Sequence, residues 1–392
     1  MTVLVDPPDA HGHGRLWSHV ASDESFEELH AFARGLGIPE RGFDRDHYDL
    51  PAEWYQRAVE AGAVPVTSRE LLTRITAAGL RRKKSQTLAP RRPGRVLLRP
   101  SRLRDGDLVA VVTPAGPVDA DRLAAGAQVL RGWGLQVRLD VGSPDTLPWL
   151  AGSDEERAAR LTSAWTDPDV RAVWTARGGY GGHRILELLD WDGLSAASPR
   201  LLVGFSDTTA LHQAFAARLG VATLHAPGVA ALSDSAAASL TELRRVVLEG
   251  GPVELVGRPD PQGGTATGVL VGGNLTVLAA TCGTPSTQPA VGGIALLEDV
   301  GEEPYRLDRS VTQLLRSGWF EGVRGVALGA FTRCGDPVQV EAALRERLST
   351  LGVPVVSGLP VGHEPANHPV LLGVRATVDG SAGTLHLDTT LR

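Results

Sequence analysis

Lysine is almost absent from this chain of 392 residues. Its only two lysines, Lys83 and Lys84, are neighbours, and arginine supplies all the other strongly basic side chains. Beyond residue 84 the chain therefore cannot use a Ser–Lys dyad, a Schiff-base lysine or the phosphate-binding lysine of a P-loop. Lysine-dependent catalysis is excluded from most of the chain.

Cysteine and long apolar runs are also scarce. The two cysteines, Cys282 and Cys334, cannot form a disulfide framework or a four-thiolate zinc site. No apolar stretch is long enough to span a bilayer, and the first residues lack the basic segment and long apolar core of a signal peptide. The net charge of −6 gives no overall attraction to nucleic acid or anionic lipid. We therefore expect a cytoplasmic protein that binds neither nucleic acid nor a membrane.

The length of 392 residues predicts two or three domains. We expect a small α/β domain over residues 1–84, a linker over 85–102, one lobe over 103–225 and a C-terminal lobe over 226–392. The linker lies in a stretch that holds both lysines, eight arginines, three prolines and no acidic residue. Such a run can contact nucleic acid. Because it lacks interleaved aromatic residues, we interpret it as a solvated tether.

The first 84 residues are rich in histidine and aspartate. These side chains are suited to binding a divalent metal or to acid–base chemistry, and equally to solvated loops and structural hydrogen bonds. The residues concerned are Asp6, His11, His13, His19, Asp44, Asp46, His47 and Asp49. No pair has a familiar helical ligand spacing, so we assign no metal ligand. This segment resembles a small uncharacterised bacterial domain, which supplies no activity, and a metal- or nucleic-acid-binding module remains one hypothesis.

Strands and helices alternate from residue 108 onwards. The predicted strands cover residues 108–113, 136–139, 170–175 and 201–203. Alternation of this kind indicates a doubly wound, mostly parallel sheet, in which ligands bind at the carboxyl ends of the strands. The turns that begin at Pro114, Gly178 and Ser206 all fall at that edge. The last 167 residues continue with strands, helices and glycine turns, and we interpret them as a second α/β lobe.

One of these turns carries a serine between a strand and a helix. The run Gly204-Phe205-Ser206-Asp207 ends an apolar strand, and helical periodicity follows it. The first N–H groups of a helix have no partners within the helix and carry partial positive charge, so they suit a developing oxyanion. This is the logic of a nucleophile elbow, although the usual Gly-x-Ser-x-Gly pattern is missing. A serine that only caps the helix is the other interpretation.

A base and an acid for such a serine are available at other strand ends. A serine hydroxyl needs a base to take its proton, and the base must be oriented by an anion. His363 follows a predicted strand, and Glu298 and Asp299 end another. His212 and His225 are competing candidates for the base. The order serine, acid, histidine also occurs in α/β hydrolases.

The glycine-rich loop Arg177-Gly178-Gly179-Tyr180-Gly181-Gly182 has two interpretations. A glycine cluster after a strand can cradle a phosphate, although the Gly-x-Gly-x-x-Gly dinucleotide pattern is not matched. Alternatively, one of its glycines brings a backbone N–H beside the serine as an oxyanion donor.

Five motifs, spread over residues 103–390, resemble those of the LD-carboxypeptidase family of serine peptidases, which includes the microcin C immunity proteins. They are Arg177-Gly178-Gly179-Tyr180-Gly181, Gly204-Phe205-Ser206-Asp207, Gly272-Gly273-Asn274-Leu275, Leu297-Glu298-Asp299 with Glu302, Pro304 and Arg309, and Gly362-His363-Glu364. The resemblance implies one lobe that bears the serine and a second lobe that bears the acid and the base. It also implies a homodimer, and no metal or cofactor.

The resemblance assigns roles to these residues. It implies Ser206 as nucleophile, Glu298 rather than Asp299 as acid, and His363 as base. The backbone of Asp207 and of Gly178 or Gly179 would form the oxyanion hole. Arg177, Asn274 and Glu302 are added as binding candidates. Residues 1–102 lie outside the family pattern and leave the physiological substrate open.

The implied substrate is a small peptide, a murein tetrapeptide, from which the enzyme releases a terminal D-alanine by cleaving an L,D-amide bond. Arg177 or Arg306 would pair with the terminal carboxylate. The alternative substrate is a peptidyl or aminoacyl nucleotide, as for the immunity proteins. An aromatic residue that stacks on the base would distinguish this case, and Trp149, Trp174 and Trp191 are the candidates.

Overall fold

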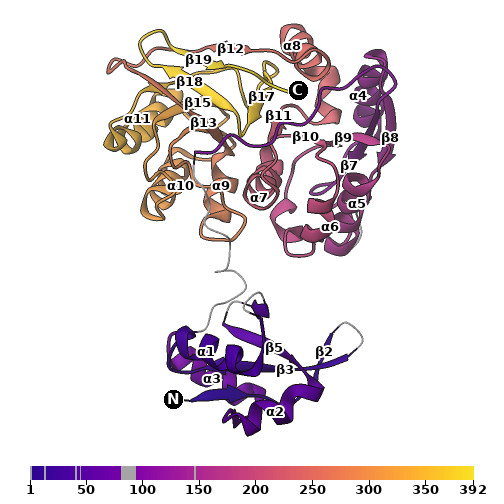
Figure 1. Ribbon diagram of the computed structural model, residues 1–392. Coiled ribbons are helices and arrows are strands. Elements are labelled where there is room, and N and C mark those ends of the chain that lie inside the picture. Colours follow the sequence, from indigo (N-terminus) through magenta and orange to yellow (C-terminus); the bar gives the residue numbers. More distant parts are fainter. Residues whose placement is uncertain (1, 13–14, 40–41, 45, 81–93, 145–146) are drawn as a thin grey trace. The chain divides into compact units, whose positions relative to one another are not determined.

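The computed structural model describes residues 2–12, 15–39, 42–44, 46–80, 94–144 and 147–392. The chain divides into two compact units, residues 1–90 and 91–392, and each is considered by itself (Figure 1). No helix within the described ranges is both long and apolar enough to cross a membrane.

The N-terminal unit is a small sheet with three α-helices (Figure 1). Its strands are β1 (Val3–Val5), β2 (Ala10–Gly12), β3 (Arg15–Ser22), β4 (Phe43–Asp44), β5 (His47–Pro51) and β6 (Val64–Pro65). Its helices are α1 (Phe26–Leu36), the 3-10 turn η2 (Ala52–Trp54), α2 (Tyr55–Glu60) and α3 (Ser68–Ala77). The strand order is β4-β5-β3-β1-β6, and β2 pairs with β3. Buried aliphatic residues of the sheet, α1 and α2 form its main core.

Helix α1 is capped by Ser25, whose side chain accepts a hydrogen bond from the N–H of Glu28. Strands β3 and β5 were not predicted. Their histidine, tryptophan and aspartate residues obscure the alternation of apolar and polar residues that identifies a strand.

The first sheet of the second unit has the order β17-β11-β10-β9-β7-β8. Its strands are β7 (Leu108–Val112), β8 (Gln136–Asp140), β9 (Val170–Thr175), β10 (Leu201–Gly204), β11 (Thr223–His225) and β17 (Val370–Leu372). All pairs are parallel except β11 with β17. The five parallel strands thus have the order 2-1-3-4-5, and the predicted doubly wound sheet is confirmed.

Helices cover both faces of this sheet. They are α4 (Ala120–Gly132), α5 (Asp154–Thr166), α6 (Trp191–Ala196), α7 (Thr209–Leu219) and α8 (Ala237–Leu248), with the 3-10 turns η4 (Gly182–Ile185), η5 (Ser206–Thr208) and η6 (Val229–Asp234). Buried residues of α5, α6 and α7 pack in one cluster, and those of α4 and α8 pack in another. The buried valines of β7, with no polar face, explain why its strand reads as a continuous apolar run.

The second sheet of this unit has the order β12-β19-β18-β13-β14-β15-β16. Its strands are β12 (Val253–Val256), β13 (Thr265–Asn274), β14 (Gly293–Val300), β15 (Gly325–Thr332), β16 (Val355–Val356), β18 (Arg375–Asp379) and β19 (Thr384–Leu387). Helices α9 (Leu275–Thr281), α10 (Pro304–Arg316) and α11 (Pro337–Leu348), the last followed by η7 (Ser349–Leu351), pack in one cluster with it. Its other face shares a continuous core with the first sheet.

The pair Gly272-Gly273 lies inside β13. As expected, Glu298 lies near the end of β14. The glycine-rich loop leads into the short turn η4. One prediction about the second unit is wrong. Residues 94–102, assigned to the linker, belong to the second unit, since the N–H of Leu97 donates to the carbonyl of Gly373 at 2.8 Å.

Candidate active site

Ser206 stands at the sharp turn between β10 and α7, as the first residue of η5. Its φ is +61°, and Ser206 and Arg333 are the non-glycine residues with positive φ in the described ranges. A left-handed backbone conformation is unfavourable for serine and marks a strained turn. The turn therefore has the backbone signature of a nucleophile elbow, and Ser206 does not act as the N-cap of a helix.

Two glycines make room for this turn. A Cβ atom on Gly204 would lie 2.3 Å from Thr175 Oγ1, and one on Gly178 would lie 2.9 Å from Ser206 Cβ and 3.1 Å from its Oγ. The same Cβ would be 3.3 Å from the backbone nitrogen of Asp207. The bare backbone of Gly178 thus passes directly beside the serine hydroxyl and the N–H that follows it.

The carboxylate of Asp207 fixes the glycine-rich loop. It accepts hydrogen bonds from the N–H of Gly181 at 3.3 Å and of Gly182 at 2.6 Å. Burial raises the pKa of Asp207, although these N–H groups oppose the shift. The backbone N–H of Asp207 lies in the first turn of η5, where N–H groups have no acceptor within the helix. The loop and the turn are therefore locked together on the side of the serine.

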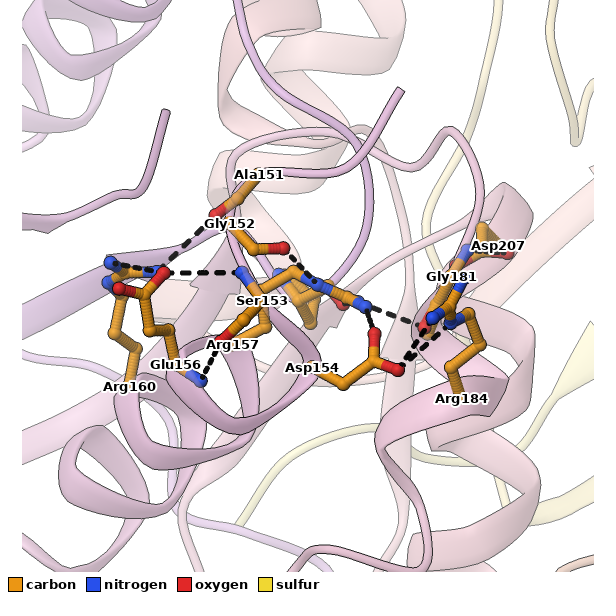
Figure 2. Close-up of polar contacts among 12 residues, drawn as sticks. Ala151, Gly152, Ser153, Asp154, Glu156, Arg157, Arg160, Gly181, Arg184 and Asp207 are labelled. Atoms are coloured by element: carbon orange, nitrogen blue, oxygen red, sulfur yellow. Dashed lines mark hydrogen bonds and ion pairs between the residues drawn. The ribbon is translucent and has the colours of Figure 1, made fainter. Parts of the chain in front are cut away.

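A buried arginine, Arg157, also binds the glycine-rich loop (Figure 2). Arg157 of α5 is fully buried, and its guanidinium donates to the carbonyl oxygens of Gly181 at 2.9 Å and of Pro114 at 2.5 Å. Another guanidinium nitrogen pairs with Asp154, which also pairs with Arg184 at 2.8 Å. Burial lowers the pKa of Arg157. One cation thus joins the loops that follow β7 and β9.

His363 and Glu298 form a hydrogen-bonded pair in the site. His363 Nδ1 lies 2.8 Å from Glu298 Oε2, so the ring donates its proton to a fully buried carboxylate. Burial alone would raise the pKa of Glu298, but contacts with His225 and His363 lower it to about 2. The His225 ring is 3.8 Å from Oε1, beyond hydrogen-bonding distance, so His363 is the closer partner. A carboxylate that stays ionised holds the imidazole in one tautomer.

Asp299 does not contact a histidine. Its side chain points to the other face of β14 and accepts hydrogen bonds from Asn274 Nδ2 at 3.0 Å and from Thr276 at 2.8 Å. Burial raises the pKa of Asp299, and these donors oppose the shift. Adjacent residues of a strand point to opposite faces, so only one of these two neighbouring carboxylates can face His363.

The other two candidate bases are buried away from the serine. His212 donates its Nε2 proton to the carbonyl oxygen of Gly204 at 2.9 Å, and burial lowers its pKa to about 3. His225 on β11 is fully buried and faces the opposite oxygen of Glu298. Neither ring lines the pocket at Ser206.

Ser206 and His363 line one pocket of about 240 Å³. Arg122, Arg177 and the Gly178–Gly179 turn also line it, and a smaller pocket of about 170 Å³ lies on the other side of His363. Within the described part of the chain, no hydrogen bond joins the Ser206 hydroxyl to His363. Such bonds often tighten only when substrate binds.

The second unit matches both halves of a peptidase family. Residues 109–226 match the LD-carboxypeptidase N-terminal domain, and residues 267–378 match the LD-carboxypeptidase C-terminal domain. The murein tetrapeptide carboxypeptidase of Pseudomonas aeruginosa is 36% identical over 290 residues, which cover 70% of this chain and 93% of that protein. This chain belongs to the LD-carboxypeptidase family of serine peptidases.

Other proteins similar to this chain also have carboxypeptidase names. A Streptomyces coelicolor protein provisionally named a carboxypeptidase is 48% identical over 311 residues, which cover 75% of this chain and 97% of that protein. The muramoyltetrapeptide carboxypeptidase of Oxalobacter formigenes superposes with a TM-score of 0.63 at 32% identity, covering 72% of this chain and 98% of that structure.

The immunity protein MccF, solved with glutamyl sulfamoyl guanosine, superposes with a TM-score of 0.66 at 20% identity. The superposed region covers 74% of this chain and 98% of that structure. At this identity, the likeness supports the fold alone. Residues 3–78 match a family of unknown function, DUF4031.

Several residues that the sequence suggested as binding candidates do not line the pocket at Ser206. Asn274 caps α9 and binds Asp299, and Glu302 pairs with the exposed Arg306 at 3.5 Å. Neither Asn274, Glu302 nor Arg306 lines the pocket. Arg177, Gly178 and Gly179, by contrast, do line it.

Sequence reasoning missed Arg122 and Arg157. Arg122 lies in the first turn of α4, lines the pockets on both sides of His363 and pairs with Asp234 at 2.8 Å. Arginine is abundant throughout the sequence, so no local signal distinguished these two residues from the others.

Proposed function

We propose that this LD-carboxypeptidase cleaves the L,D-amide bond of murein tetrapeptides and releases the terminal D-alanine through an acyl-enzyme. The observation that carries the proposal is the strained Ser206 turn, which shares a pocket with His363 while Glu298 holds the far side of the His363 ring. Serine, histidine and a carboxylate that binds the far ring nitrogen are the residue types that a serine triad needs.

In the proposed reaction, His363 takes the proton of the Ser206 hydroxyl as the oxygen attacks the scissile carbonyl. The N–H groups of Asp207 and of the Gly178–Gly179 turn stabilise the oxyanion that forms. His363 then protonates the leaving amine, D-alanine departs, and a water molecule hydrolyses the ester on Ser206 by the same route. Glu298 stays ionised throughout and stabilises the imidazolium.

The terminal carboxylate of the substrate needs a cationic partner. Arg122 and Arg177 both line the pocket at Ser206, whereas Arg306 lies outside it. Arg177 is exposed, and its guanidinium donates a long hydrogen bond of 3.3 Å to the carbonyl oxygen of Pro117. A guanidinium in this setting can turn to bind a carboxylate through two parallel hydrogen bonds. We assign this role to Arg177, with Arg122 beside it.

Murein peptides are favoured over aminoacyl nucleotides by two observations. The named murein peptidase from P. aeruginosa is 36% identical, whereas MccF is 20% identical. Among the tryptophans considered for base stacking, Trp174 is fully buried and Trp191 packs on Phe215. Trp149 is exposed but does not line the pocket at Ser206.

The test is release of free D-alanine from a murein tetrapeptide by the full chain and by a chain that begins at Gly94. We expect both to release it, because residues 91–392 form a compact unit by themselves. Ser206→Ala should abolish turnover, whereas Ser349→Ala, at an exposed serine of η7, should leave it unchanged. Turnover by Ser206→Ala would refute the triad. Cleavage of an aminoacyl sulfamoyl nucleoside but not of the tetrapeptide would refute the murein assignment.

A further inference from the structure

Three potential metal ligands meet on one face of the N-terminal sheet. His19 on β3 pairs directly with Asp49 on β5, and His47 lies two residues before Asp49 on the same strand. Residues two apart on a strand share a face, so all three side chains project from the same side. One ligand atom from each lies within 4.8 Å of the other two.

Both histidines are oriented by a buried aspartate. His19 Nδ1 lies 3.0 Å from Asp6 Oδ2, and His47 Nδ1 lies 2.7 Å from Asp46 Oδ1. Asp6 and Asp46 are each only 1% exposed. Histidines that bind metals in proteins almost always donate their second ring N–H to a carboxylate or carbonyl in this way. The arrangement therefore has the outer partners of a metal site as well as its ligands.

The centre of this cluster suits a cation. When each ring is neutral and its Nδ1 proton is directed to its own aspartate, the Nε2 atoms present lone pairs. Those atoms face the same oxygen, Asp49 Oδ1, at 3.2 Å from His47 and 3.8 Å from His19. Two lone pairs and an anionic oxygen repel each other unless a proton or a metal ion lies among them.

The spacing fits a metal ion. Tetrahedral zinc with bonds of about 2.0–2.1 Å holds its ligand atoms about 3.3 Å apart. The separation of 3.2 Å between His47 and Asp49 matches this value, and the separation of 3.8 Å between His19 and Asp49 is longer. Two histidines and one carboxylate leave further coordination positions open, as in catalytic zinc and non-haem iron sites. A pocket of about 310 Å³ lined by His19, His47 and Ser68 adjoins the cluster.

We propose that His19, His47 and Asp49 bind one divalent transition-metal ion, with Asp6 and Asp46 as the outer partners of the two histidines. These residues belong to the N-terminal unit, whereas the proposed triad belongs to the second unit. The proposal assigns a metal ligand to a domain whose family has no known function. His13 lies outside the described residues, and the structure describes only the backbone of His11 and Asp44, so the assignment does not use them.

The test is zinc binding by the full chain after a chelator has removed bound metal. We expect one equivalent of Zn²⁺ by calorimetry, and visible absorption bands when Co²⁺ replaces it. Asp49→Asn and His47→Gln should each weaken zinc binding by at least about 100-fold, and Asp46→Asn by about 10–100-fold through the His47 ring. Circular dichroism of each variant checks that the domain remains folded.

The matched control is His386→Gln. His386 also lies between two carboxylates, with Glu254 at 3.7 Å and Asp388 at 3.8 Å, but it lies in the peptidase unit and outside the cluster. Its substitution should not change zinc binding. If His47→Gln unfolds the domain, Asp49→Asn, at a half-exposed position, decides the question. Zinc binding that is absent in the parent chain, or equal in Asp49→Asn and the parent, would overturn the proposal.

Discussion

Replacing Glu298 by glutamine tests the proposed triad at its most buried member. The two side chains have nearly the same shape, so packing around the fully buried position should persist. The chemistry differs, because an amide can donate as well as accept. In the parent enzyme Glu298 Oε2 accepts the Nδ1 proton of His363 at 2.8 Å. The amide NH2 of glutamine can instead donate to Nδ1, which moves the ring proton to Nε2 and removes the lone pair that should activate Ser206.

The expected loss of activity is large. In serine peptidases, the equivalent substitution lowers kcat by about 10⁴-fold because the histidine has the wrong tautomer. At about 1.36 kcal/mol per factor of ten, this is about 5 kcal/mol of transition-state stabilisation. We expect kcat for D-alanine release by Glu298→Gln to fall by this amount, with little change in KM, since Glu298 does not line the substrate pocket.

Stability should change in a pH-dependent way. The pKa of Glu298 is lowered from 4.5 to about 2, which corresponds to about 3 kcal/mol of stabilisation of the ionised form. A lowered carboxyl pKa stabilises the fold fully above the unfolded value and loses this effect as the pH falls through the folded value. Denaturant titrations of the parent and Glu298→Gln should therefore differ most above pH 4.5 and converge toward pH 2.

The matched control is Asp299→Asn, at the neighbouring carboxylate. Asp299 is also buried and hydrogen-bonded, but its partners are Asn274, Thr276 and Val300. The substitution should lower stability without changing the tautomer of His363, so kcat should stay within about tenfold of the parent value. If Asp299→Asn loses activity as strongly as Glu298→Gln, or if Glu298→Gln keeps kcat within tenfold, the proposed role of Glu298 is refuted.

Three further substitutions test the surroundings of the site. Arg157→Met leaves buried carbonyl groups and Asp154 without their cation, so the free energy of unfolding in urea should fall by about 3–5 kcal/mol; a change below 1 kcal/mol would contradict the network in Figure 2. Gly178→Ala puts a methyl group 2.9 Å from Ser206 Cβ and 3.1 Å from its hydroxyl oxygen, so the serine turn must shift and kcat should fall by at least about 100-fold, while circular dichroism shows that the fold is retained. Arg177→Gln should raise KM about tenfold with kcat unchanged, whereas Arg306→Gln should change neither, and equal effects of the two would remove Arg177 from substrate binding.

The parts that the sequence predicted well are those where local pattern and fold agree. The buried parallel strands β7, β9 and β10 are continuous apolar runs, and their order along the chain leads directly to a doubly wound sheet. The turn at Ser206 was predicted because a glycine, a serine and a new helix follow one of these runs. Such features depend on neighbours in the sequence, which a sequence displays directly.

The parts that the sequence could not supply depend on contacts between distant segments. Residue types do not distinguish the adjacent carboxylates Glu298 and Asp299; the family resemblance implied Glu298, and the physical reason is which face of β14 is turned toward His363. Arg157 joins loops that are 43 and 24 residues away along the chain. Its role follows from complete burial of a guanidinium, which is exceptional for arginine and invisible in an arginine-rich sequence.

The histidine and aspartate cluster of the N-terminal domain shows the same limit in another form. No histidine or aspartate pair in this domain has a familiar helical ligand spacing. His47 and Asp49, however, are two residues apart on a strand, which places both on one face. His19 joins them only through the register of β3 with β5. Strand register brings together residues about 30 positions apart, and no spacing rule within one segment can find such a set. In a domain whose strands are short and polar, pairs of ligands at a spacing of two are therefore the signal to search for, and register then selects the third.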